Sequence, residues 1–367
     1  MKLIYLTAKE YPGGTADHIY IREMARAFYS LMGNDFLFVT AKNVSKEISE
    51  FPNLSANIKW SHGKSFFYFF WLPYFILRSK NWTRDTVFFS NDPNLLVLLI
   101  FWKRMFRFKN KICSDWHMLF GDWRDSFIVD GSDYLITTSE KLKKSIVAIS
   151  KNKGKKVLVV YGGVNLEKYE SLNKSDARNK LNLPKDKKIV AYVGFFKTMG
   201  MEKGIKTMIE ALPELPSEVI MLFVGGKDDE IWEYKKFAEN KGVSDRCIFI
   251  GRKPQDELFL YETASDVLSI PYPDQPHFRN FGFPMKVYEY MANRRPIIYS
   301  KLELVEEVIG DCAYSFVPDD FKSFAKTIKV IIDNEKGAVE SASRAYEKLE
   351  KYTWNRKADT ILQNVGN

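Results

Sequence analysis

Short apolar runs alternate with longer amphipathic stretches along most of the chain. Residues 3–8 form the first such run, a Gly-containing turn follows at 11–15, and residues 17–31 carry apolar side chains at helical spacing. A second apolar run at 36–40 completes a strand–helix–strand unit, which predicts neighbouring parallel strands. The alternation continues to residue 334, so the sequence predicts an α/β fold of two Rossmann-like, doubly wound domains that face each other across a cleft.

A polar segment separates the two halves of this alternation. Residues 167–186 are rich in Lys, Asn and Ser and end in a Pro-Lys-Asp turn. Such a composition is typical of the segment that joins two domains. We therefore predict a first domain over residues 1–166 and a second domain over residues 187–351.

The charge balance narrows the range of partners. The chain carries 55 Lys and Arg against 46 Asp and Glu, a formal net charge of +9, which favours nucleic acid, an anionic membrane surface or phosphorylated small molecules. No pattern typical of an RNA- or DNA-binding module occurs, so nucleic acid is not expected as a partner. Three widely spaced cysteines and only four histidines argue against a disulfide framework and a structural zinc site. They favour a location in the reducing cytoplasm.

Two aromatic segments lie next to basic residues. Residues 66–77 read FFYFFWLPYFIL between Lys64 and Arg78, and residues 95–102 precede a cluster of Lys and Arg. The first segment is too short to span a bilayer, which takes roughly 20 residues. It is either a buried core helix that begins or bends at Pro73, or an interfacial element on a membrane surface. The second interpretation predicts a cytoplasmic protein peripheral to the inner face of the membrane, with contacts at Phe67, Phe70, Trp71, Arg104 and Arg107.

Residues 281–291, which read FGFPMKVYEYM, carry the clearest candidate chemistry. Pro284 stands where a helix would begin, and Lys286 and Glu289 lie one turn apart on the same face. A helix start and a lysine suit a phosphate group, and Gly282 allows close approach to it. A carboxylate at the position of Glu289 accepts hydrogen bonds from a ribose diol. An ordinary amphipathic helix with a surface Lys–Glu pair has the same local pattern.

Two further candidates follow predicted strands, at the ends where parallel sheets bind ligands. Gly13 and Gly14 follow the first strand but lack the full G-x-G-x-x-G pattern, which disfavours a dinucleotide site and leaves a plain tight turn as the alternative. His117 follows the predicted strand 111–114 and lies within the sequence DWH. A single histidine at such a place is either structural or part of a site.

The order of these pieces resembles a retaining glycosyltransferase of family 4, which has the GT-B fold. The resemblance covers nearly the whole chain, and residues 352–367 resemble the helix that crosses back to the first domain. The motifs that carry it are Gly13-Gly14, DWH at 115–117, SDYLITTSE at 132–140, YGGVN at 161–165, the loop from Gly194 to Gly204, Gly251-Arg252, and PMKVYEYMA at 284–292.

This resemblance implies transfer of a sugar, with retained anomeric configuration, from a UDP- or GDP-sugar to a lipid-linked, polysaccharide or other glycan acceptor. It implies that Lys203 neutralises the leaving diphosphate and that His117 contacts the sugar or the reaction centre. Because cationic side chains neutralise the diphosphate in such a site, as a metal ion otherwise would, no metal and no other cofactor is expected. The implied donor-binding residues are Gly14, Gly194, Lys197, Arg252, Gly282, Phe283, Pro284, Lys286 and Glu289.

Two positions depart from the family pattern. Phe281 stands where the E-x7-E pattern has its first acid, so the sugar preference of the family is not carried over. Phe195 replaces the basic residue that usually follows the first glycine of the 194–204 loop. The missing acid also suits a non-catalytic, membrane-attached protein that binds sugar nucleotides. A nucleotide-sugar epimerase or phosphorylase on the same fold is the other alternative, although epimerases need paired acid–base carboxylates and the sequence has no clear pair.

Overall fold

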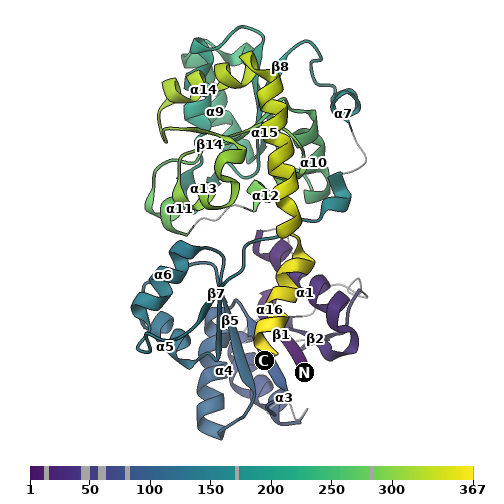
Figure 1. The fold of residues 1–367 in the computed structure, drawn as a ribbon, viewed down its shortest axis with the longest axis vertical. Coiled ribbons are helices and arrows are strands. Elements are labelled where there is room, and N and C mark those ends of the chain that lie inside the picture. The colour runs from purple at the N-terminus through teal and green to yellow at the C-terminus, as the bar shows by residue number, and fades with distance from the viewer. Residues whose placement is uncertain are drawn as a thin grey trace. The chain divides into compact units, whose positions relative to one another are not determined.

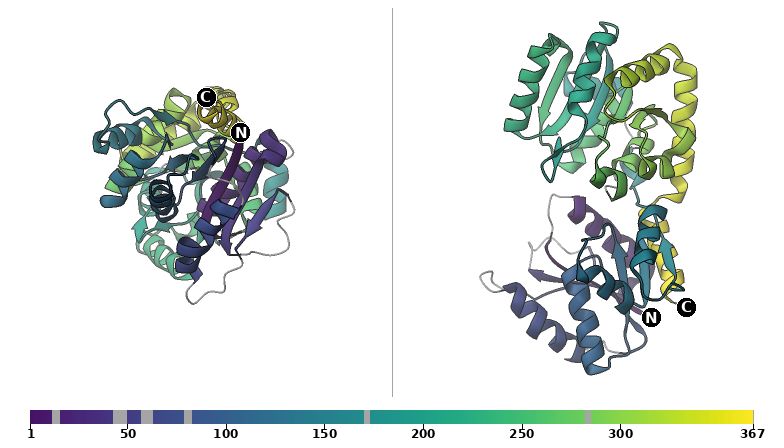
Figure 2. Two further views of the ribbon diagram at one scale, coloured as in Figure 1. Left: turned by 90° about the horizontal axis from the view of Figure 1, so that it is seen from below. Right: turned by 90° about the vertical axis from the view of Figure 1, so that its left-hand side faces the viewer.

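The chain folds into two compact α/β units (Figure 1). In this computed structural model, unit 1 comprises Met1–Gly163 with Trp354–Asn367, and unit 2 comprises Val164–Thr353. Helices flank the parallel sheet of each unit (Figure 2), which confirms the predicted pair of doubly wound domains. The structure describes residues 1–11, 16–42, 50–56, 63–78, 83–169, 173–281 and 285–366.

Unit 1 is built on a seven-stranded parallel sheet with the order β3-β2-β1-β4-β5-β6-β7. Leu3 of β1 pairs with Phe36 of β2 on one side and with Val87 of β4 on the other. Because the strand order reverses between β1 and β4, the loops that follow these strands diverge and leave a crevice at their carboxyl ends. The strands are β1 (Lys2–Glu10), β2 (Phe36–Lys42), β3 (Asn53–Ser55), β4 (Thr86–Ser90), β5 (Lys111–Trp116), β6 (Tyr134–Thr137) and β7 (Val157–Val159).

The helices of unit 1 cover this sheet, and several begin at a capping side chain. Asp92 accepts hydrogen bonds from the amides of Asn94 and Leu95, and Ser139 accepts one from the amide of Leu142. The helices are α1 (Ala16–Met32), α2 (Gly63–Phe66), α3 (Leu72–Arg78), α4 (Pro93–Phe106), α5 (Trp123–Gly131), α6 (Glu140–Ile149) and α16 (Trp354–Val365), with the 3₁₀ turn η1 (Gly33–Asp35) and the π-helical turn η2 (Phe67–Trp71).

The aromatic segment forms one helical stretch through α2, η2 and α3, and it divides between core and surface. Its inward side chains, Phe67, Leu72, Phe75 and Ile76, are buried. Phe67 is 0% exposed and stacks on Trp71 at 5.3 Å between ring centroids, so the prediction that Phe67 contacts a membrane is wrong. The outward side chains are Phe66, Phe69, Phe70, Tyr74 and Leu77.

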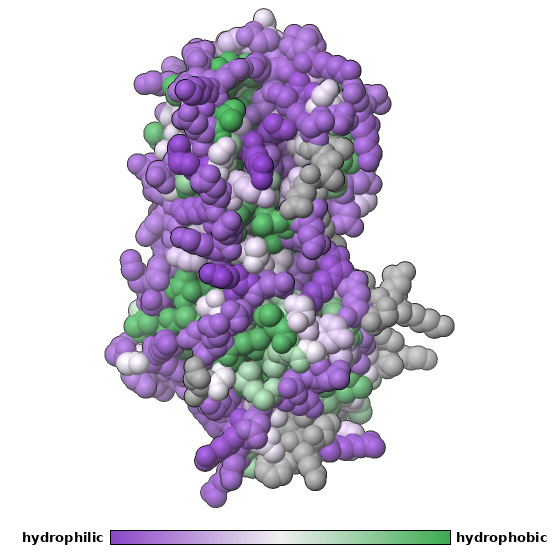
Figure 3. All heavy atoms as spheres, turned by 45° about the vertical axis from the view of Figure 1, so that its right-hand side comes forward, coloured by the Kyte–Doolittle hydropathy of each residue, from purple (hydrophilic) through white to green (hydrophobic). Residues whose placement is uncertain are grey.

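Helix α4 lies beside this stretch: the indole N–H of Trp102 in α4 donates a hydrogen bond to the carbonyl oxygen of Tyr68 at 3.3 Å. We call the exposed apolar side chains of the two elements the aromatic surface: Phe66, Phe69, Phe70, Tyr74 and Leu77 with Phe101, Met105 and Phe106. Figure 3 shows hydrophobic residues gathered over unit 1, while unit 2 is largely hydrophilic in that view. In the described part of the chain, every helix is too short or too polar to cross a bilayer.

Unit 2 is built on a six-stranded parallel sheet with the order β12-β11-β8-β13-β14-β15. A small antiparallel hairpin, β9–β10, lies in the loop after β8, where the sequence predicted only a long loop. The strands are β8 (Lys188–Val193), β9 (Lys197–Thr198), β10 (Met201–Glu202), β11 (Val219–Gly226), β12 (Cys247–Gly251), β13 (Val267–Ile270), β14 (Ile297–Ser300) and β15 (Tyr314–Phe316).

The helices of unit 2 include one in the polar segment 167–186 that the sequence assigned to the domain boundary. Helix α7 (Lys174–Leu181) lies in this segment, and its buried Arg178 donates a hydrogen bond to Asp266 at 2.6 Å. The others are α8 (Ile205–Ala211), α9 (Asp228–Asn240), α10 (Gln255–Ala264), α11 (Pro276–Asn280), α12 (Lys286–Ala292), α13 (Glu303–Ile309), α14 (Phe321–Asp333) and α15 (Glu335–Lys348), with 3₁₀ turns η3 (Leu166–Tyr169), η4 (Leu212–Glu214), η5 (Ser244–Arg246), η6 (Gly310–Cys312) and η7 (Leu349–Lys351).

After η7 the chain returns to unit 1, where α16 packs against α1. The ring of Trp354 lies edge-on to Tyr20 of α1 at 5.5 Å between centroids. A side chain at Gly163 would collide with Trp354, since a Cβ atom there would stand 2.7 Å from its ring. Residues far apart in the sequence therefore meet at the carboxyl ends of the unit 1 strands.

Candidate functional site

In unit 2, Lys286 at the start of α12 turns toward the carboxyl end of β8. Its ammonium donates a hydrogen bond to the carbonyl oxygen of Val193, the last residue of β8, and lies 4.0 Å from the ring centroid of Tyr192. Burial lowers the pKa of Lys286 to about 7, with a further contribution from the positive charge of Lys203. The residue as a whole is partly exposed.

Lys203, which follows β10, supplies a second cation to the same place. Its ammonium lies 5.8 Å from the ring centroid of Tyr272, and burial lowers its pKa to about 8 against the opposing effect of Glu230. Its charge also lowers the pKa of His277 in α11, after the larger effect of burial. Among the residues that the structure describes, neither Lys203 nor Lys286 forms an ion pair with a carboxylate. We call these two residues the lysine pair.

Two glycines allow the backbone to pack tightly around the lysine pair. Gly194 has φ +139°, and a Cβ atom there would stand 2.4 Å from the ammonium nitrogen of Lys286. Gly204 has φ +85°, and its Cβ atom would stand 1.7 Å from the carbonyl oxygen of Pro271. Both conformations are costly for residues with a side chain, so the sequence motif that ends in Gly204 has a steric basis here.

Glu289 lies one turn after Lys286 on α12, as the helical spacing predicted. It accepts a hydrogen bond from Gln255 of α10 at 2.9 Å. A second carboxyl group, Glu262, is buried nearby and accepts from the Asn293 amide at 2.7 Å. Burial and then the charge of Glu289 raise the pKa of Glu262 to about 8. The sequence reading did not identify this second carboxyl group, since only the fold brings α10 against α12.

Two other predicted donor-binding residues, Lys197 and Arg252, interact with side chains outside the lysine pair, and the rest lie outside the described residues. Lys197 of β9 forms an ion pair with Glu233 of α9 at 2.7 Å. Arg252 is exposed and its guanidinium stacks over the ring of Phe195 at 4.5 Å. Gly14, Gly282, Phe283 and Pro284 lie outside the described residues.

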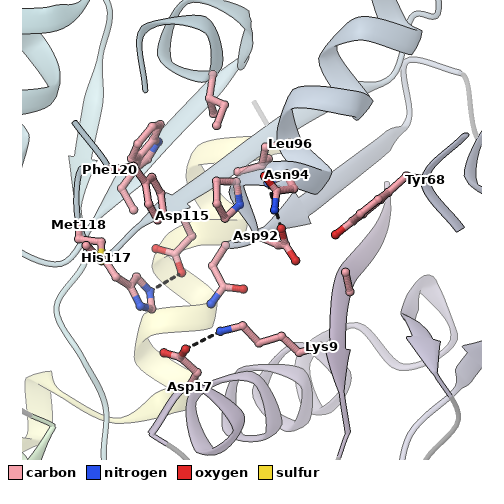
Figure 4. Close-up of a pocket in the computed structure, with 15 residues that line it drawn as sticks. Lys9, Asp17, Tyr68, Asp92, Asn94, Leu96, Asp115, His117, Met118 and Phe120 are labelled. Carbon is pink, nitrogen blue, oxygen red and sulfur yellow. Dashed lines mark hydrogen bonds and ion pairs between the residues drawn. The ribbon is translucent and has the colours of Figure 1, made fainter. Parts of the chain in front are cut away.

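In unit 1, a cavity of about 350 Å³ opens at the carboxyl ends of β1, β4 and β5, where the reversal of strand order predicts a ligand site. His117, which directly follows β5, lines it as the sequence indicated. Figure 4 shows His117 directed toward Asp115 on one side of the cavity and Lys9 directed toward Asp17 on another. Tyr68 contributes to the lining from the aromatic segment.

Asp115 interacts with the His117 ring in the cavity wall. The His117 Nε2 atom lies 3.2 Å from the Asp115 Oδ2 atom, and the buried hydroxyl of Tyr20 donates to the same oxygen. Burial acts to raise the pKa of Asp115, but His117 and then Lys357 outweigh it and hold the pKa below its ordinary value. Lys357 of α16 is itself buried and donates to the carbonyl oxygen of Val160 at 2.7 Å. Asp115 is therefore an anion that orients the His117 ring.

Local sequence signals account for only part of this cluster. Asp115 could have been identified from the sequence, because it is a carboxylate near the end of a predicted strand and belongs to the same DWH motif as His117. No sequence feature links Lys357 or Tyr20 to that motif, because both reach Asp115 through the packing of α16 and α1. Among the described residues, no group of three or more His, Cys, Asp or Glu side chains suits a metal ion.

Comparison with known proteins finds similarity to glycosyltransferases, with the family match in unit 2. Residues 173–352 match the family model described as "Glycosyl transferases group 1". The chain is 24% identical over 240 residues to a D-inositol 3-phosphate glycosyltransferase of Mycolicibacterium smegmatis, covering 64% of this chain and 53% of that protein. It is 26% identical over 259 residues to an uncharacterized glycosyltransferase of Methanocaldococcus jannaschii, covering 64% and 62%. The chain thus spans about half the length of the curated relatives it matches.

Solved structures of GT-B glycosyltransferases share the fold of the whole chain. Anabaena Alr3699/HepE in complex with UDP has a TM-score of 0.77 at 17% identity, with all of both chains covered. Sucrose-phosphate synthase from Thermosynechococcus elongatus has a TM-score of 0.76 at 20% identity, with 99% and 98% covered. WaaG, a glycosyltransferase of lipopolysaccharide biosynthesis, has a TM-score of 0.69 at 14% identity, with 99% of both covered. These similarities confirm the predicted fold class.

Proposed function

We propose that the protein is a retaining glycosyltransferase that moves a sugar from a UDP- or GDP-sugar to a lipid-linked, polysaccharide or other glycan acceptor. The observation that carries this proposal is the lysine pair, two partly buried cations that form no direct ion pair with a carboxylate among the described residues. The match of residues 173–352 to a glycosyltransferase family model supports it. So do the similar structures that are named as complexes with UDP and with UDP-glucose.

The chemistry assigned to the lysine pair is stabilisation of the departing diphosphate. As the bond from the anomeric carbon to the diphosphate breaks, negative charge grows on the leaving oxygen. The oxygen of the acceptor hydroxyl forms the new bond to that carbon, and its proton passes to the departing diphosphate. Cations held in place by the fold stabilise this charge without reorganisation, and partial burial strengthens the interaction. Lys203 and Lys286 fill this role in our proposal, and no metal ion is required.

Other predicted residues receive supporting roles. Glu289 lies one helical turn from Lys286, at a spacing that suits a ribose diol next to a diphosphate. Arg252 flanks the base, and its stacking on Phe195 offers a flat, cationic surface for it. His117, oriented by Asp115, contacts the reacting sugar.

Replacement of Lys203 by alanine tests the enzymatic role. We expect Lys203→Ala to keep its circular dichroism spectrum and to lose about 100-fold in turnover of the nucleotide sugar, the usual cost of removing one preorganised charge-stabilising group. Lys206→Ala is the matched control, because Lys206 is an exposed lysine three residues further on that pairs with Glu233. Unchanged turnover in Lys203→Ala would refute the assignment.

Binding, transfer and NMR measurements separate the glycosyltransferase from its alternatives. Thermal-shift screening of UDP- and GDP-sugars identifies the donor, since a bound ligand raises the melting temperature. Donor binding without transfer to any glycan acceptor would favour the non-catalytic alternative, and interconversion of the donor sugar would favour the epimerase. Proton NMR of the first-formed product reports whether the anomeric configuration is retained.

We further propose that unit 1 docks on the inner face of the cytoplasmic membrane through the aromatic surface. Exposed apolar side chains with arginines beside them suit the headgroup region of an anionic lipid membrane. Phe70 is 66% exposed, and Arg104 and Arg107 lie exposed next to Phe101 and Phe106 on and just after α4. The predicted contacts Phe70, Trp71, Arg104 and Arg107 remain part of this proposal, and Phe66 and Phe69 replace the buried Phe67.

Vesicle co-sedimentation tests the membrane proposal. The protein should pellet with vesicles of phosphatidylcholine and phosphatidylserine, and less so as salt is raised. The double variant Arg104→Glu, Arg107→Glu should bind at least about tenfold more weakly, because each basic residue near such a surface contributes about 1 kcal/mol. Lys322→Glu, at an exposed site on α14 of unit 2, is the control. Equal binding of the double variant and the control would contradict the proposal.

A further inference from the structure

Helix α16 places a lysine in the core of unit 1. Lys357 is 2% exposed, and its ammonium donates hydrogen bonds to the carbonyl oxygens of Val160 at 2.7 Å and Tyr161 at 3.1 Å, directly after β7. The same nitrogen lies 5.4 Å from the ring centroid of Tyr20 in α1. Burying an ammonium is costly unless a negative charge compensates for it, and an apolar side chain of similar volume avoids that cost. The lysine therefore indicates a compensating charge nearby.

The compensating charge is the carboxylate of Asp115, which is 3% exposed. Burial lowers the pKa of Lys357, and Asp115 opposes this effect. Burial acts in the other direction on Asp115, where His117 and then Lys357 outweigh it and keep the pKa of the carboxyl group below its ordinary value. No direct ion pair joins Lys357 and Asp115 among the described residues, so their attraction acts across the buried interior, where charges are screened little.

The other ionisable side chains in the core around Asp115 carry no charge. Burial and then the charge of Asp115 raise the pKa values of Tyr5 in β1, Tyr20 in α1 and Cys113 in β5, so all three stay protonated. The neutral hydroxyl of Tyr20 donates a hydrogen bond to the Oδ2 atom of Asp115. In the described part of the chain, the cations that act on Asp115 are therefore His117 and Lys357.

On the cavity side of His117, the charges already balance. Lys9 forms an ion pair with Asp17, and both line the cavity. Burial acts to raise the pKa of Asp17, but the hydrogen bond and charge of Lys9 lower it, followed by the charges of His117 and His18. Asp17 is thus an anion with its own countercharge. Whether His117 carries a proton on both ring nitrogens therefore depends chiefly on the buried charges behind it.

Two cations compete to balance the same carboxylate. Asp115 favours the protonated, cationic form of His117 unless another cation balances its charge, and Lys357 is such a cation. An ionised carboxylate only accepts hydrogen bonds, so the Nε2 atom of His117, 3.2 Å from the Oδ2 atom of Asp115, carries a proton. The other ring nitrogen, Nδ1, has no hydrogen-bond partner among the described residues, and in a neutral ring it is an acceptor.

We propose that Lys357 is a positioning residue: it balances the charge of Asp115, so that His117 meets a sugar hydroxyl as a neutral imidazole whose Nδ1 atom accepts a hydrogen bond. This inference rests on the proposed function, because the contact between His117 and the reacting sugar belongs to that activity. Lys357 touches no substrate in this role and acts through Asp115. Tyr20 completes the support, since its hydroxyl donates to Asp115 and its ring lies edge-on to His117 at 4.4 Å between centroids.

Nitrogen NMR of the histidine rings in the full chain tests this role, with His117→Gln used to assign the signals. At pH 8 the native protein should hold the His117 proton on Nε2, and a proton on Nδ1 would overturn the proposal without any variant. In Lys357→Met the Asp115–His117 pair should keep its additional proton to a pH about one unit higher, because Asp115 then draws its countercharge from His117. An unchanged titration midpoint would overturn the proposal.

The pH profile of nucleotide-sugar turnover separates positioning from a merely structural role. At pH 5.5 Lys357→Met should be about tenfold slower than the native protein, because one pH unit changes the fraction of neutral imidazole about tenfold. The ratio of native to variant turnover should fall toward one by pH 8.5. Lys357→Gln, which keeps N–H donors for the carbonyl oxygens of Val160 and Tyr161 without the charge, should behave in the same way. An equal loss at every pH would overturn the proposal.

Two control variants separate charge from packing. Ile361→Ala removes a fully buried side chain from α16, so it should lower the midpoint of urea denaturation and leave the His117 titration unchanged. Lys156→Met removes a lysine that donates to Asn364 of α16 at 3.3 Å on the surface, and it should change neither measurement. A titration shift in Ile361→Ala as large as the shift in Lys357→Met would count against the charge of Lys357.

The outcomes distinguish this inference from the proposed function. Native transfer activity together with an unchanged His117 titration in both Lys357→Met and Lys357→Gln would overturn the role of Lys357 and leave the glycosyltransferase function intact. A raised midpoint in both variants of a protein that transfers no sugar would support the charge balance between Lys357 and Asp115 and refute the enzymatic proposal.

Discussion

Replacing Lys286 by methionine should make the protein more stable and, at the same time, a weaker nucleotide binder. A pKa lowered from 10.5 to about 7, by burial and then by the charge of Lys203, corresponds to a cost of about 5 kcal/mol for the charged lysine, at about 1.36 kcal/mol for each pKa unit. The partly accessible side chain recovers some of this in water, and the variant loses a charge-assisted hydrogen bond to Val193 worth about 1.5–3 kcal/mol. We expect a net gain of about 1–2 kcal/mol at pH 7, with methionine filling a similar volume.

The pH dependence of this gain follows from the direction of the pKa change. Below pH 7 both the folded and the unfolded lysine are charged, so the full cost of burying the charge is present. Between pH 7 and 10.5 the folded lysine releases a proton that the unfolded lysine keeps, so the native protein gains stability as the pH rises. The advantage of Lys286→Met should therefore shrink steadily from pH 7 to pH 10.

Urea denaturation at pH 6.5, 8 and 9.5 measures the stability difference, and calorimetric titration with UDP measures affinity. Affinity should fall about tenfold or more, because one charged hydrogen bond to phosphate is lost. Lys236→Met, at an exposed lysine over the ring of Trp232 in α9, is the control for removal of a positive charge. A destabilised Lys286→Met with unchanged UDP binding would refute the view of Lys286 as a strained, ligand-directed cation.

Two further predictions concern the same unit. Gly204→Ala should lower the free energy of unfolding by about 3 kcal/mol or more, since strain at positive φ costs about 1–3 kcal/mol and the Cβ atom would also stand 1.7 Å from the Pro271 carbonyl oxygen. Gly200→Ala, with φ +78° and no atom within 4 Å, should lower it by only about 1–2 kcal/mol in the same urea experiment. Equal losses in the two variants would show that the contact with Pro271 is unimportant. Glu289→Gln should weaken UDP about tenfold but leave 2′-deoxy-UDP less affected, and an equal loss for both nucleotides in a calorimetric titration would contradict ribose binding by Glu289.

The sequence by itself determined the fold class and the position of several site residues along the chain. Alternation of buried strands and amphipathic helices has a local period, so it predicted the parallel strands at 3–8 and 36–40, which lie within β1 and β2. The same logic placed His117 after β5 and put Lys286 and Glu289 on one helix. These predictions depend only on residues close together in sequence.

Only the tertiary structure decided what these side chains contact. Lys357 donates to Val160, 197 residues away in sequence, and its charge helps to keep Asp115 ionised beside His117. Lys197, a predicted donor ligand, is instead paired with Glu233, while Lys286 turns toward β8. Charge neutralisation and burial depend on which strands are neighbours in the sheet and which helices cover them. A local periodicity carries no information about those neighbours, because pKa values and ion pairs are set by distances through space.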